Sequence, residues 1–438
     1  MNFSSDLLLQ KISPSPPAGH PGRLWVAFSG GLDSTVLLHA LAARRDALAA
    51  PLHAVHVNHN LHAESEAWGQ HCRRICESLD VPLESFGVRI DAAPGLSVEG
   101  AARDARYDVF RELLDTDEIL LTAQHQDDQL ETFLLQALRG AGPHGLAAMP
   151  QQARLGAGWL LRPLLDWPRA ALESWAREQE FEWLEDPSNS DERFDRNYLR
   201  RRITPLLRDR WPAAAQTISR GARHCAEAAI LIDELAAADL AACGLGNGTL
   251  NVIVLRTLDT ARRRNVLRHW LDWSGFPRPS EKKLEHILAD VLEAGPDAVP
   301  CVDWADVAVR RYRDVLYAER ELPPPQGGAW KDEVFDLGAG WGRLRRAASD
   351  APGLPEGAPI EVRFREGGEK IRPLGRKHHH ELKKLFQDAG VLPWRRPLIP
   401  LIYVDNVLAA VGDSWINADI ARTPGWQVNW EGRPVLFH

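Results

Sequence analysis

The sequence predicts an α/β fold: an N-terminal domain with a parallel sheet, then a helical domain and a small mixed α/β C-terminal domain. In the first 140 residues, apolar strand-like runs alternate with amphipathic helical patterns. Such alternation indicates parallel strands, because parallel neighbours need crossover connections. From about residue 211 an Ala-rich helical pattern replaces it. We therefore expect domains over residues 1–210, 211–325 and 350–438.

Four strand–helix units make up the expected sheet. Their strands are expected at 23–28, 52–58, 82–90 and 118–124, and their helices at 34–45, 65–79, 97–114 and 128–140. Ligands of open parallel sheets bind outside the carboxyl ends of the strands. Functional residues are therefore expected directly after each strand.

The remainder of the chain has a different pattern. Residues 213–242 predict one long amphipathic helix, and the Pro- and Gly-rich segments 321–330 and 351–359 indicate linkers or exposed loops. Strand-like runs at 397–405 and 407–412 then predict the small mixed domain.

Composition excludes several classes of protein. The chain is 45% hydrophobic and 26% charged, with a net charge of −8, which is typical of a soluble globular protein. It has no run near the ~18–20 apolar residues that span a bilayer, and its N-terminus does not resemble a signal peptide. Five cysteines in 438 residues do not make a disulfide framework. These features predict a cytoplasmic protein that does not interact with membranes.

The segment SGGLDS, residues 29–34, follows the first expected strand and precedes a helix. Its small residues present several backbone N–H groups at a helix N-terminus, which suits an anionic phosphate. Asp33 would repel phosphate unless it also holds a cation such as Mg²⁺. No lysine lies between Lys11 and Lys282, so the loop lacks the lysine of a Walker motif. It therefore suits a departing pyrophosphate better than a γ-phosphate held for hydrolysis.

This segment resembles the Ser-Gly-Gly-x-Asp-Ser signature of the PP-loop ATP pyrophosphatase superfamily, which has an adenine nucleotide alpha hydrolase-like fold. The resemblance implies ATP cleavage between the α- and β-phosphates and adenylation of a substrate oxygen. It assigns Mg²⁺ to Asp33. It assigns the ATP contacts to Ser29, Gly30, Gly31, Leu32, Asp33 and Ser34.

Further segments narrow the resemblance. They are HVNHNLHAESEAW (56–68), GLSVEGAARDARY (95–107), LLTAQHQDDQLETFLLQALRGAG (120–142), LLRPLLDWPR (160–169), WLEDPSNSDERFDRNYLRRRITPLL (183–207) and a terminal block over 367–412. In this order they resemble the tRNA(Ile)-lysidine synthetase family, closely over about the first 210 residues and well over the last 75 or so. The middle of the chain matches mainly in being helical.

The family resemblance implies a reaction and its partners. The ε-amine of free L-lysine is joined to C2 of the wobble cytidine in the isoleucine tRNA with the CAU anticodon. ATP is required because the cytidine O2 is a poor leaving group until it is adenylated. Pyrophosphate and then AMP leave.

The segment HQDDQLET supplies the expected acid–base groups. Asp128 and Glu131 are three residues apart, so they share a helix face near its N-terminus. There a carboxylate is able to bind Mg²⁺, orient the lysine ammonium or remove its proton. Helix capping is the alternative role, and for Asp127 both readings stay open. His125 is expected to contact the nucleotide, although the family usually has a second histidine where this chain has Gln124.

Arginines are expected to supply the positive charge that a lysine would otherwise provide. Arg106 would neutralise phosphate, and Arg196 matches the family and would reach the active site. Residues 193–223 hold nine arginines against two acids. Such a run of charges usually indicates a solvated helix face. The local excess of positive charge also predicts that Arg200 and Arg201 contact the tRNA backbone.

The terminal segment 361–400 repeats this charge pattern, with ten Lys and Arg against five Asp and Glu. Basic residues interleaved with an aromatic one suit contact with phosphate, sugar or base. The tRNA contacts expected here are Lys377, Lys383, Lys384, Trp394 and Arg395.

Two other functions remain as alternatives. A tRNA thiolation enzyme of the same superfamily also adenylates a base oxygen, but its chemistry normally needs a persulfide cysteine or an iron–sulfur cluster. The chain has no C-x-x-C motif and no cysteine in the segments that follow the strands. A catalytically inactive tRNA-binding protein is the second alternative, which intact Asp33, Asp128 and Glu131 disfavour. The sequence leaves the oligomeric state open, a homodimer included.

Overall fold

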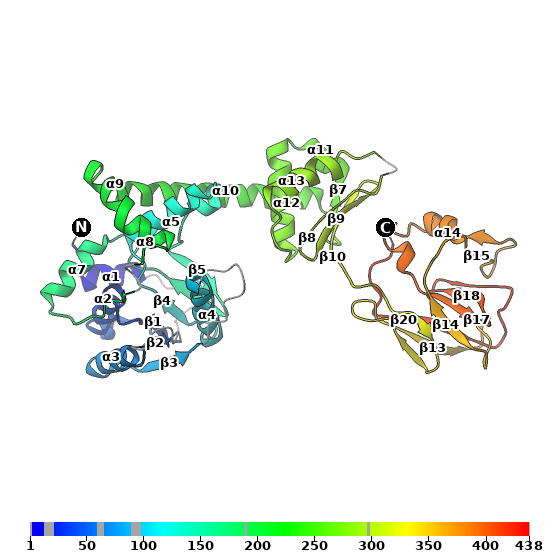
Figure 1. Cartoon of the computed structure of the whole chain (residues 1–438), viewed down its shortest axis with the longest axis horizontal. Coiled ribbons are helices and arrows are strands. Elements are labelled where there is room, and N and C mark those ends of the chain that lie inside the picture. The colour runs from blue at the N-terminus through cyan, green and yellow to red at the C-terminus, as the bar shows by residue number, and fades with distance from the viewer. Residues whose placement is uncertain are drawn as a thin grey trace. The chain divides into compact units, whose positions relative to one another are not determined.

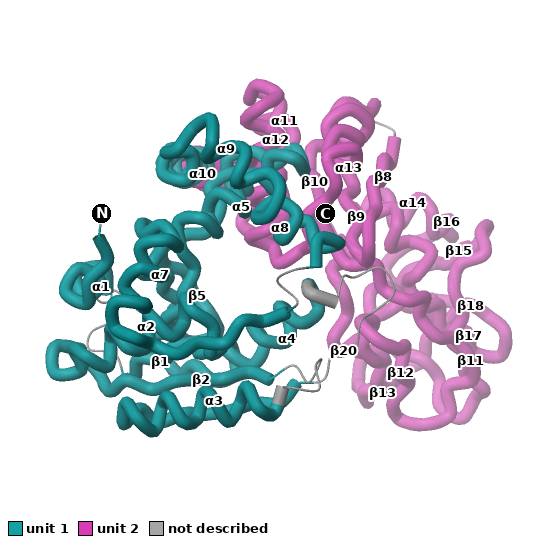
Figure 2. The backbone as a smooth tube through the Cα atoms, turned by 60° about the vertical axis from the view of Figure 1, so that its left-hand side comes forward, with its two compact units in different colours: residues 1–232 teal, residues 233–438 magenta. Residues whose placement is uncertain are grey.

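The computed structural model describes residues 2–12, 22–58, 65–88, 98–187, 191–295 and 298–437. These form two compact units, residues 1–232 and 233–438 (Figure 2). Parts of three segments that carry the family resemblance, residues 59–64, 95–97 and 188–190, lie outside the described residues.

Unit 1 is built around a six-stranded sheet with the order β3-β2-β1-β4-β6-β5 (Figure 1). All neighbours pair in parallel except β5 and β6, which form an antiparallel hairpin at one edge. The strands are β1 (Leu24–Ala27), β2 (Leu52–Asn58), β3 (Leu83–Gly87), β4 (Ile119–Leu121), β5 (Gln152–Leu155) and β6 (Gly158–Leu161). The predicted parallel α/β domain is confirmed, and the hairpin is an addition to it.

Helices cover both faces of this sheet. The helices of residues 1–210 are α1 (Ser5–Ile12), α2 (Leu32–Ala42), α3 (Ser65–Ser78), α4 (Val98–Leu113), α5 (Gln126–Leu138), α6 (Pro143–Leu146), α7 (Arg169–Glu178), α8 (Asp195–Tyr198) and α9 (Thr204–Arg210). A π-helical turn, Leu199–Ile203, joins α8 to α9.

The two-residue period of the strands decides which helices lie on which face. Leu24 and Val26 of β1 are buried in a core shared with α1, α2, α3 and α7. Trp25, between them, points to the opposite face and packs with Phe110 and Leu114 on and after α4. The glycine-rich segment after β1 and the segment of His125 after β4 both lie at the carboxyl ends of the parallel strands.

The first part of unit 2 combines helices with a sheet. The long helix α10 (Ala214–Cys243) contains the boundary between the units, and α11 (Val252–Thr257), α12 (Thr260–Trp273) and α13 (Glu281–His286) follow. They pack on a four-stranded antiparallel sheet with the order β7-β10-β9-β8. Its strands are β7 (Leu250–Asn251), β8 (Cys301–Trp304), β9 (Val307–Tyr312) and β10 (Val315–Arg320). The helical pattern was predicted, whereas these short strands, joined by tight turns, were not.

The last part of the chain is mostly antiparallel sheet. A five-stranded sheet, β11-β14-β17-β18-β19, and a three-stranded sheet, β12-β13-β20, share one core with α14 (Leu382–Asp388), and β15 and β16 form a separate two-stranded sheet. The strands are β11 (Gly328–Ala329), β12 (Val334–Asp336), β13 (Arg343–Ser349), β14 (Ile360–Arg363), β15 (Lys370–Ile371), β16 (His380–Glu381), β17 (Leu401–Val404), β18 (Val407–Val411), β19 (Trp415–Ile416) and β20 (Gly425–Glu431). No helix in the described part of the chain combines the length and apolarity that crossing a bilayer requires.

Candidate active site

Residues 28–34, which we call the glycine loop, run from the end of β1 through the first turn of α2. Ser34 donates its hydroxyl to the Gly31 carbonyl (3.0 Å) and accepts from the Ser29 N–H (3.2 Å). Gly31 is the N-cap of α2 and makes no side-chain cap. The loop is thus closed on itself by its own serines, and the first N–H groups of α2 have no capping side chain to satisfy them. This arrangement suits an anion.

Gly30 is required by the packing of the loop. Its φ of +80° is a conformation that side chains other than glycine rarely adopt. A Cβ at this position would lie 3.0 Å from the Cys72 Sγ and 3.3 Å from a Leu184 methyl. The Gly30 carbonyl also accepts a hydrogen bond from the Leu184 N–H (2.8 Å). The loop therefore lies tightly against α3 and the chain after α7.

Asp33 is the loop residue whose chemistry suits a cation. Its Oδ1 is buried and, among the described residues, accepts no hydrogen bond. Burying a carboxylate oxygen without a partner costs free energy unless a positive group binds it. Mg²⁺ prefers one or two carboxylates together with substrate phosphates, so Asp33 fits the metal that the sequence assigned to it.

His125 connects the glycine loop to α5. It is the N-cap of that helix: its Nδ1 accepts from the Asp128 N–H (3.4 Å), while Asp128 Oδ2 accepts from the His125 N–H (2.9 Å). Its Nε2 lies 3.6 Å from Asp33 Oδ2 and 3.4 Å from Asp128 Oδ2. One buried imidazole therefore lies between a carboxylate of the loop and a carboxylate of α5.

The surroundings of His125 favour its charged form. Burial lowers the pKa of the imidazole, but the charge of Asp128 and the hydrogen bond and charge of Asp33 outweigh it, and the net shift is upward. Protonation turns Nδ1 into a donor and gives up the long capping bond. The carboxylates of Asp128 and Asp33 therefore favour the protonated form of this ring.

Asp128 and Glu131 form a paired cluster with two arginines of the segment after α7. Glu131 accepts from Arg196 Nε (2.7 Å) and Arg200 Nε (2.7 Å). Asp128 Oδ1 accepts from the same two guanidinium groups, at 2.9 and 3.2 Å. Both carboxylates are buried, with side-chain exposures of 12% and 2%. We call these four residues the acid–arginine cluster.

The charges in this cluster hold one another in their ionised forms. Burial raises the pKa of Asp128, but the charges of His125 and Arg196 outweigh it and the net shift is downward. Burial likewise lowers the pKa of Arg196, and the two carboxylates reverse that. The carboxylate of Asp128 is therefore present as an anion that accepts protons only weakly.

The π-helical turn separates the arginine run into two directions. Arg196 and Arg200 reach inward to α5, whereas Arg201 and Arg202 face outward to Glu192, at 3.6 and 3.1 Å. Arg200, predicted to contact tRNA together with Arg201, thus lies in the acid–arginine cluster instead of on the outer surface.

Arg106 lies on α4 and is exposed. Its charge is felt by His56, whose pKa is lowered first by burial and then by Arg106. The His56 Nδ1 hydrogen-bonds the Phe28 carbonyl at the start of the glycine loop (2.9 Å). Arg106 is therefore within electrostatic reach of His56, which supports the glycine loop.

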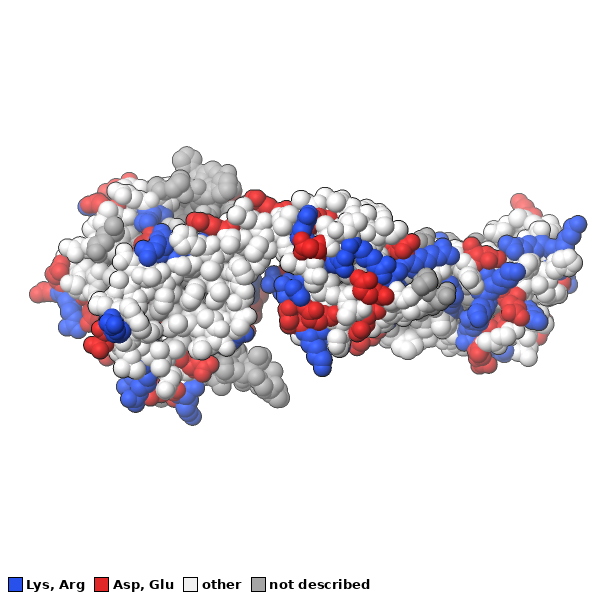
Figure 3. Space-filling view, turned by 90° about the horizontal axis from the view of Figure 1, so that it is seen from above, with Lys and Arg blue, Asp and Glu red and all other residues white. Residues whose placement is uncertain are grey.

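The tRNA contacts predicted in the terminal segment separate into two groups. Lys377, Lys383 and Lys384, which we call the basic strip, are exposed. Arg395 is buried at 7% exposure and donates to Glu319 (2.6 Å), and Trp394 packs edge-on against Tyr317. These last two side chains are used in packing within unit 2. On the face in Figure 3, basic and acidic side chains are interleaved.

Two arginines near the site were not predicted. Arg208 pairs with Asp127, whose other oxygen accepts from the Arg169 N–H (2.8 Å). The Arg169 Nε lies 3.7 Å from Asp33 Oδ1. Arg169 ends the segment LLRPLLDWPR, so its place after a strand was the available signal. Asp127 thus links α5 to α7 and α9. Of its two possible roles, catalysis or helix stabilisation, these contacts favour the structural one.

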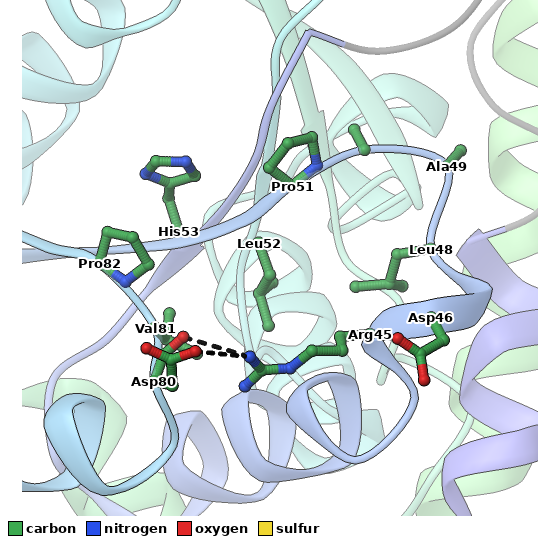
Figure 4. A pocket seen from close by; sticks show the side chains of 11 residues that line it. Arg45, Asp46, Leu48, Ala49, Pro51, Leu52, His53, Asp80, Val81 and Pro82 are labelled. Carbon is green, nitrogen blue, oxygen red and sulfur yellow. Dashed lines mark hydrogen bonds and ion pairs between the residues drawn. The ribbon is translucent and has the colours of Figure 1, made fainter.

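A separate pocket of about 470 Å³ lies at the amino-terminal ends of β2 and β3. Figure 4 shows Arg45 directed at Asp80, with Pro51, Leu52 and Pro82 lining the space. Because these residues precede their strands or lie at the amino-terminal end of β2, the pocket lies at the end of the sheet opposite the glycine loop. It does not belong to the site.

Sequence comparisons agree with this geometry. A family described as PP-loop domain matches residues 7–207, a TilS substrate binding domain matches 250–317, and a TilS substrate C-terminal domain matches 360–430. The chain is 43% identical over 419 residues to the tRNA(Ile)-lysidine synthase of Methylococcus capsulatus, covering 92% of this chain and 95% of that protein. The enzymes of that name from Coxiella burnetii and Alkalilimnicola ehrlichii are 41% and 42% identical, with 93% and 95% of this chain covered and 93% and 97% of theirs.

The fold and the glycine loop define the class: a PP-loop enzyme that uses ATP. Within that class, the chain belongs to the tRNA(Ile)-lysidine synthase family. The family predicted from the order of the sequence segments is confirmed.

Proposed function

We propose that the protein joins the ε-amine of free L-lysine to C2 of the wobble cytidine in isoleucine tRNA with the CAU anticodon. The cytidine O2 attacks the α-phosphate of ATP, and the α–β phosphoanhydride bond breaks to release pyrophosphate. The lysine nitrogen then attacks C2, the C2–O2 bond breaks, and AMP leaves with the former O2. The amine loses its protons to a base during this second step.

The observation that carries this proposal is the placement of the glycine loop, with its Asp33, beside His125 and the acid–arginine cluster, in a chain of this family. The loop amides suit the phosphates, and Asp33 would hold Mg²⁺, which neutralises charge on the pyrophosphate as it leaves. His125 joins this part of the site to Asp128.

The acid–arginine cluster is the proposed lysine site. An ammonium needs carboxylates to hold it and an acceptor to make it a nucleophile. Asp128 and Glu131 are buried anions at the amino end of α5, and their arginine partners keep them in place. Before the substrate lysine binds, Arg196 and Arg200 neutralise these two carboxylates.

The cysteines support this reaction over tRNA thiolation. Cys72 and Cys76, on the helix behind the loop, are buried thiols, and burial raises the pKa of each to about 12. A thiol of this kind is protonated at neutral pH and a poor nucleophile. All five cysteines are free thiols, which fits the cytoplasmic location that we propose.

The test is incubation of the protein with ATP, labelled lysine and the CAU-anticodon tRNA. We expect label on the tRNA in step with AMP release, and no label on the same tRNA carrying uridine at the wobble position. Modification that needs a sulfur donor would favour the thiolation alternative. Binding of the tRNA without any AMP release would mean an inactive binding protein.

A further inference from the structure

Arg169 is the first residue of α7 and faces the glycine loop. Its side chain is 45% exposed, and its Nε lies 3.7 Å from Asp33 Oδ1. Its guanidinium also approaches Glu173 on the next turn, at 3.9 Å. Both distances are too long for a hydrogen bond. Within the described residues, the guanidinium of Arg169 thus lies near two carboxylates and donates a hydrogen bond to neither.

The backbone of Arg169 is fixed independently of its side chain. Its N–H donates to Asp127 Oδ2 at 2.8 Å, and Asp127 is held from its other oxygen by Arg208. Asp127 belongs to the first turn of α5, whose N-cap is His125. The starting point of the Arg169 side chain is therefore as well defined as that of His125, while the guanidinium is free to reorient.

The site needs a cation at this position. ATP brings several negative charges to a loop that has no lysine, and Asp33 adds another. Among the arginines predicted for this role, Arg196 is paired with two buried carboxylates. Arg200, whose charge interacts with that of Asp33, is paired with the same two carboxylates, whereas Arg169 Nε lies 3.7 Å from Asp33 Oδ1 outside the cluster. A guanidinium binds phosphate oxygens with paired, charge-assisted hydrogen bonds.

We propose that Arg169 binds the β- and γ-phosphates of ATP beside Asp33 and holds the pyrophosphate as it leaves. It would exchange its loose approach to Asp33 for hydrogen bonds to phosphate oxygens. This proposal rests on the use of ATP in the proposed function, and it adds a phosphate ligand that comes from α7 instead of the loop.

The experiment measures ligand binding to the full-length protein without tRNA or lysine. Wild type, Arg169→Ala and Arg169→Lys are titrated calorimetrically with ATP, pyrophosphate and AMP, each with Mg²⁺. Arg177→Ala is the matched control, because Arg177 lies on the same helix and pairs with Glu173 at the surface. The Ala variant keeps the backbone bond to Asp127, so its unfolding midpoint in urea should equal that of wild type.

We expect Arg169→Ala to weaken ATP and pyrophosphate binding by about tenfold or more, as for a lost charge-assisted hydrogen-bond pair. AMP binding should change less than about twofold, and Lys should restore part of the loss. Equal weakening of all three ligands would show a structural role, and unchanged ATP and pyrophosphate binding would also overturn the proposal. A wild-type protein that binds no ATP would instead contradict the proposed function itself.

Discussion

The glycine-loop edge of unit 1 and the basic strip of unit 2 use charge in opposite ways. At the loop edge, His125, Asp128 and Glu131 are almost fully buried, and each has a partner of opposite charge. In the basic strip, Lys383 and Lys384 are exposed on the outer face of α14. Buried charges interact strongly over short distances, whereas exposed charges are screened by salt.

This difference indicates what each region is suited to do. A buried, mutually paired cluster is preorganised, so it binds a small charged group in one geometry and responds to pH and to loss of a single partner. An exposed lysine pair binds a phosphate backbone without fixed geometry and responds to ionic strength. The four predictions that follow test whether the regions differ in this way.

The largest effect is expected from Asp33→Ala. This change removes the proposed magnesium ligand, and we expect AMP release to fall by about 100-fold or more. The free energy of unfolding should change far less than the activity, because Asp33 Oδ1 has no hydrogen-bond partner in the described structure and Oδ2 only approaches His125 Nε2, at 3.6 Å. Activity is followed by labelled AMP and stability by urea unfolding. Asp33→Asn, which keeps the shape, should lose nearly as much activity; an active Asn variant would rule out a metal role.

Glu131→Gln should damage both activity and stability. The change leaves Arg196 and Arg200 without one of their two carboxylates in a buried site, which we expect to cost about 2 kcal/mol of unfolding free energy. Lysine-dependent labelling of tRNA should fall about tenfold or more. The control is Glu173→Gln, whose partner Arg177 is 67% exposed, and its cost should stay below about 0.5 kcal/mol. Equal costs for the two variants would remove the contrast between buried and exposed pairs.

The raised pKa of His125 predicts how stability depends on pH. The folded pKa lies above 6.5, so protonation of His125 stabilises the fold below that pH, and this contribution is lost as pH rises through the folded pKa. Asp128 has the opposite sign: its folded pKa lies below 3.8, so its contribution is present above that pH and disappears in stronger acid.

Urea unfolding at about pH 5.5 and about pH 8.5 tests this prediction. Wild type should lose on the order of 1 kcal/mol more than His125→Asn between the two pH values. Asparagine is a suitable N-cap, so the variant keeps the capping acceptor while removing the titrating ring. His224→Asn, at an exposed position of α10, should follow wild type. Identical pH profiles for wild type and His125→Asn would contradict the carboxylate-held proton.

Much of the fold was predictable because its signals are local. Each strand and helix of the parallel sheet has its own periodicity, and the glycine loop is contiguous in sequence. The β5–β6 hairpin was missed because it is short and its tight turn relies on Gly156, with a φ of +57°, without a longer alternating pattern. The four-stranded sheet of unit 2 was missed because its two tight turns place Ala305 and Arg313, instead of glycine, at positive φ and so give no turn signal in the sequence.

The pairing within the site was not predictable from local signals. Glu131 and Arg196 are 65 residues apart, and only the folded chain brings them to 2.7 Å. The arginine run was interpreted as one surface, although the helical geometry sends Arg196 and Arg200 inward and Arg201 outward. The composition also predicted that Trp394 and Arg395 are exposed, whereas tertiary packing buries Arg395 and half-buries Trp394.

The smallest effect is expected from Lys383→Ala combined with Lys384→Ala. The double change removes two exposed charges of the basic strip while the buried face of α14, with Leu382, Leu385 and Phe386, is untouched. We expect tRNA binding to weaken a few-fold at low salt, and the slope of log affinity against log salt to fall by about 1 to 2.

Filter binding across a salt series measures this slope. Lys331→Ala, which removes an exposed charge of unit 2 outside the segment 361–400, is the control and should keep the wild-type slope. The rate of AMP release at saturating tRNA should not change in the double variant, because the strip contributes to affinity and not to the chemical step. A lower rate at saturation would mean that the terminal module positions the wobble cytidine as well as holding the tRNA. An unchanged slope would remove the basic strip from the tRNA interface.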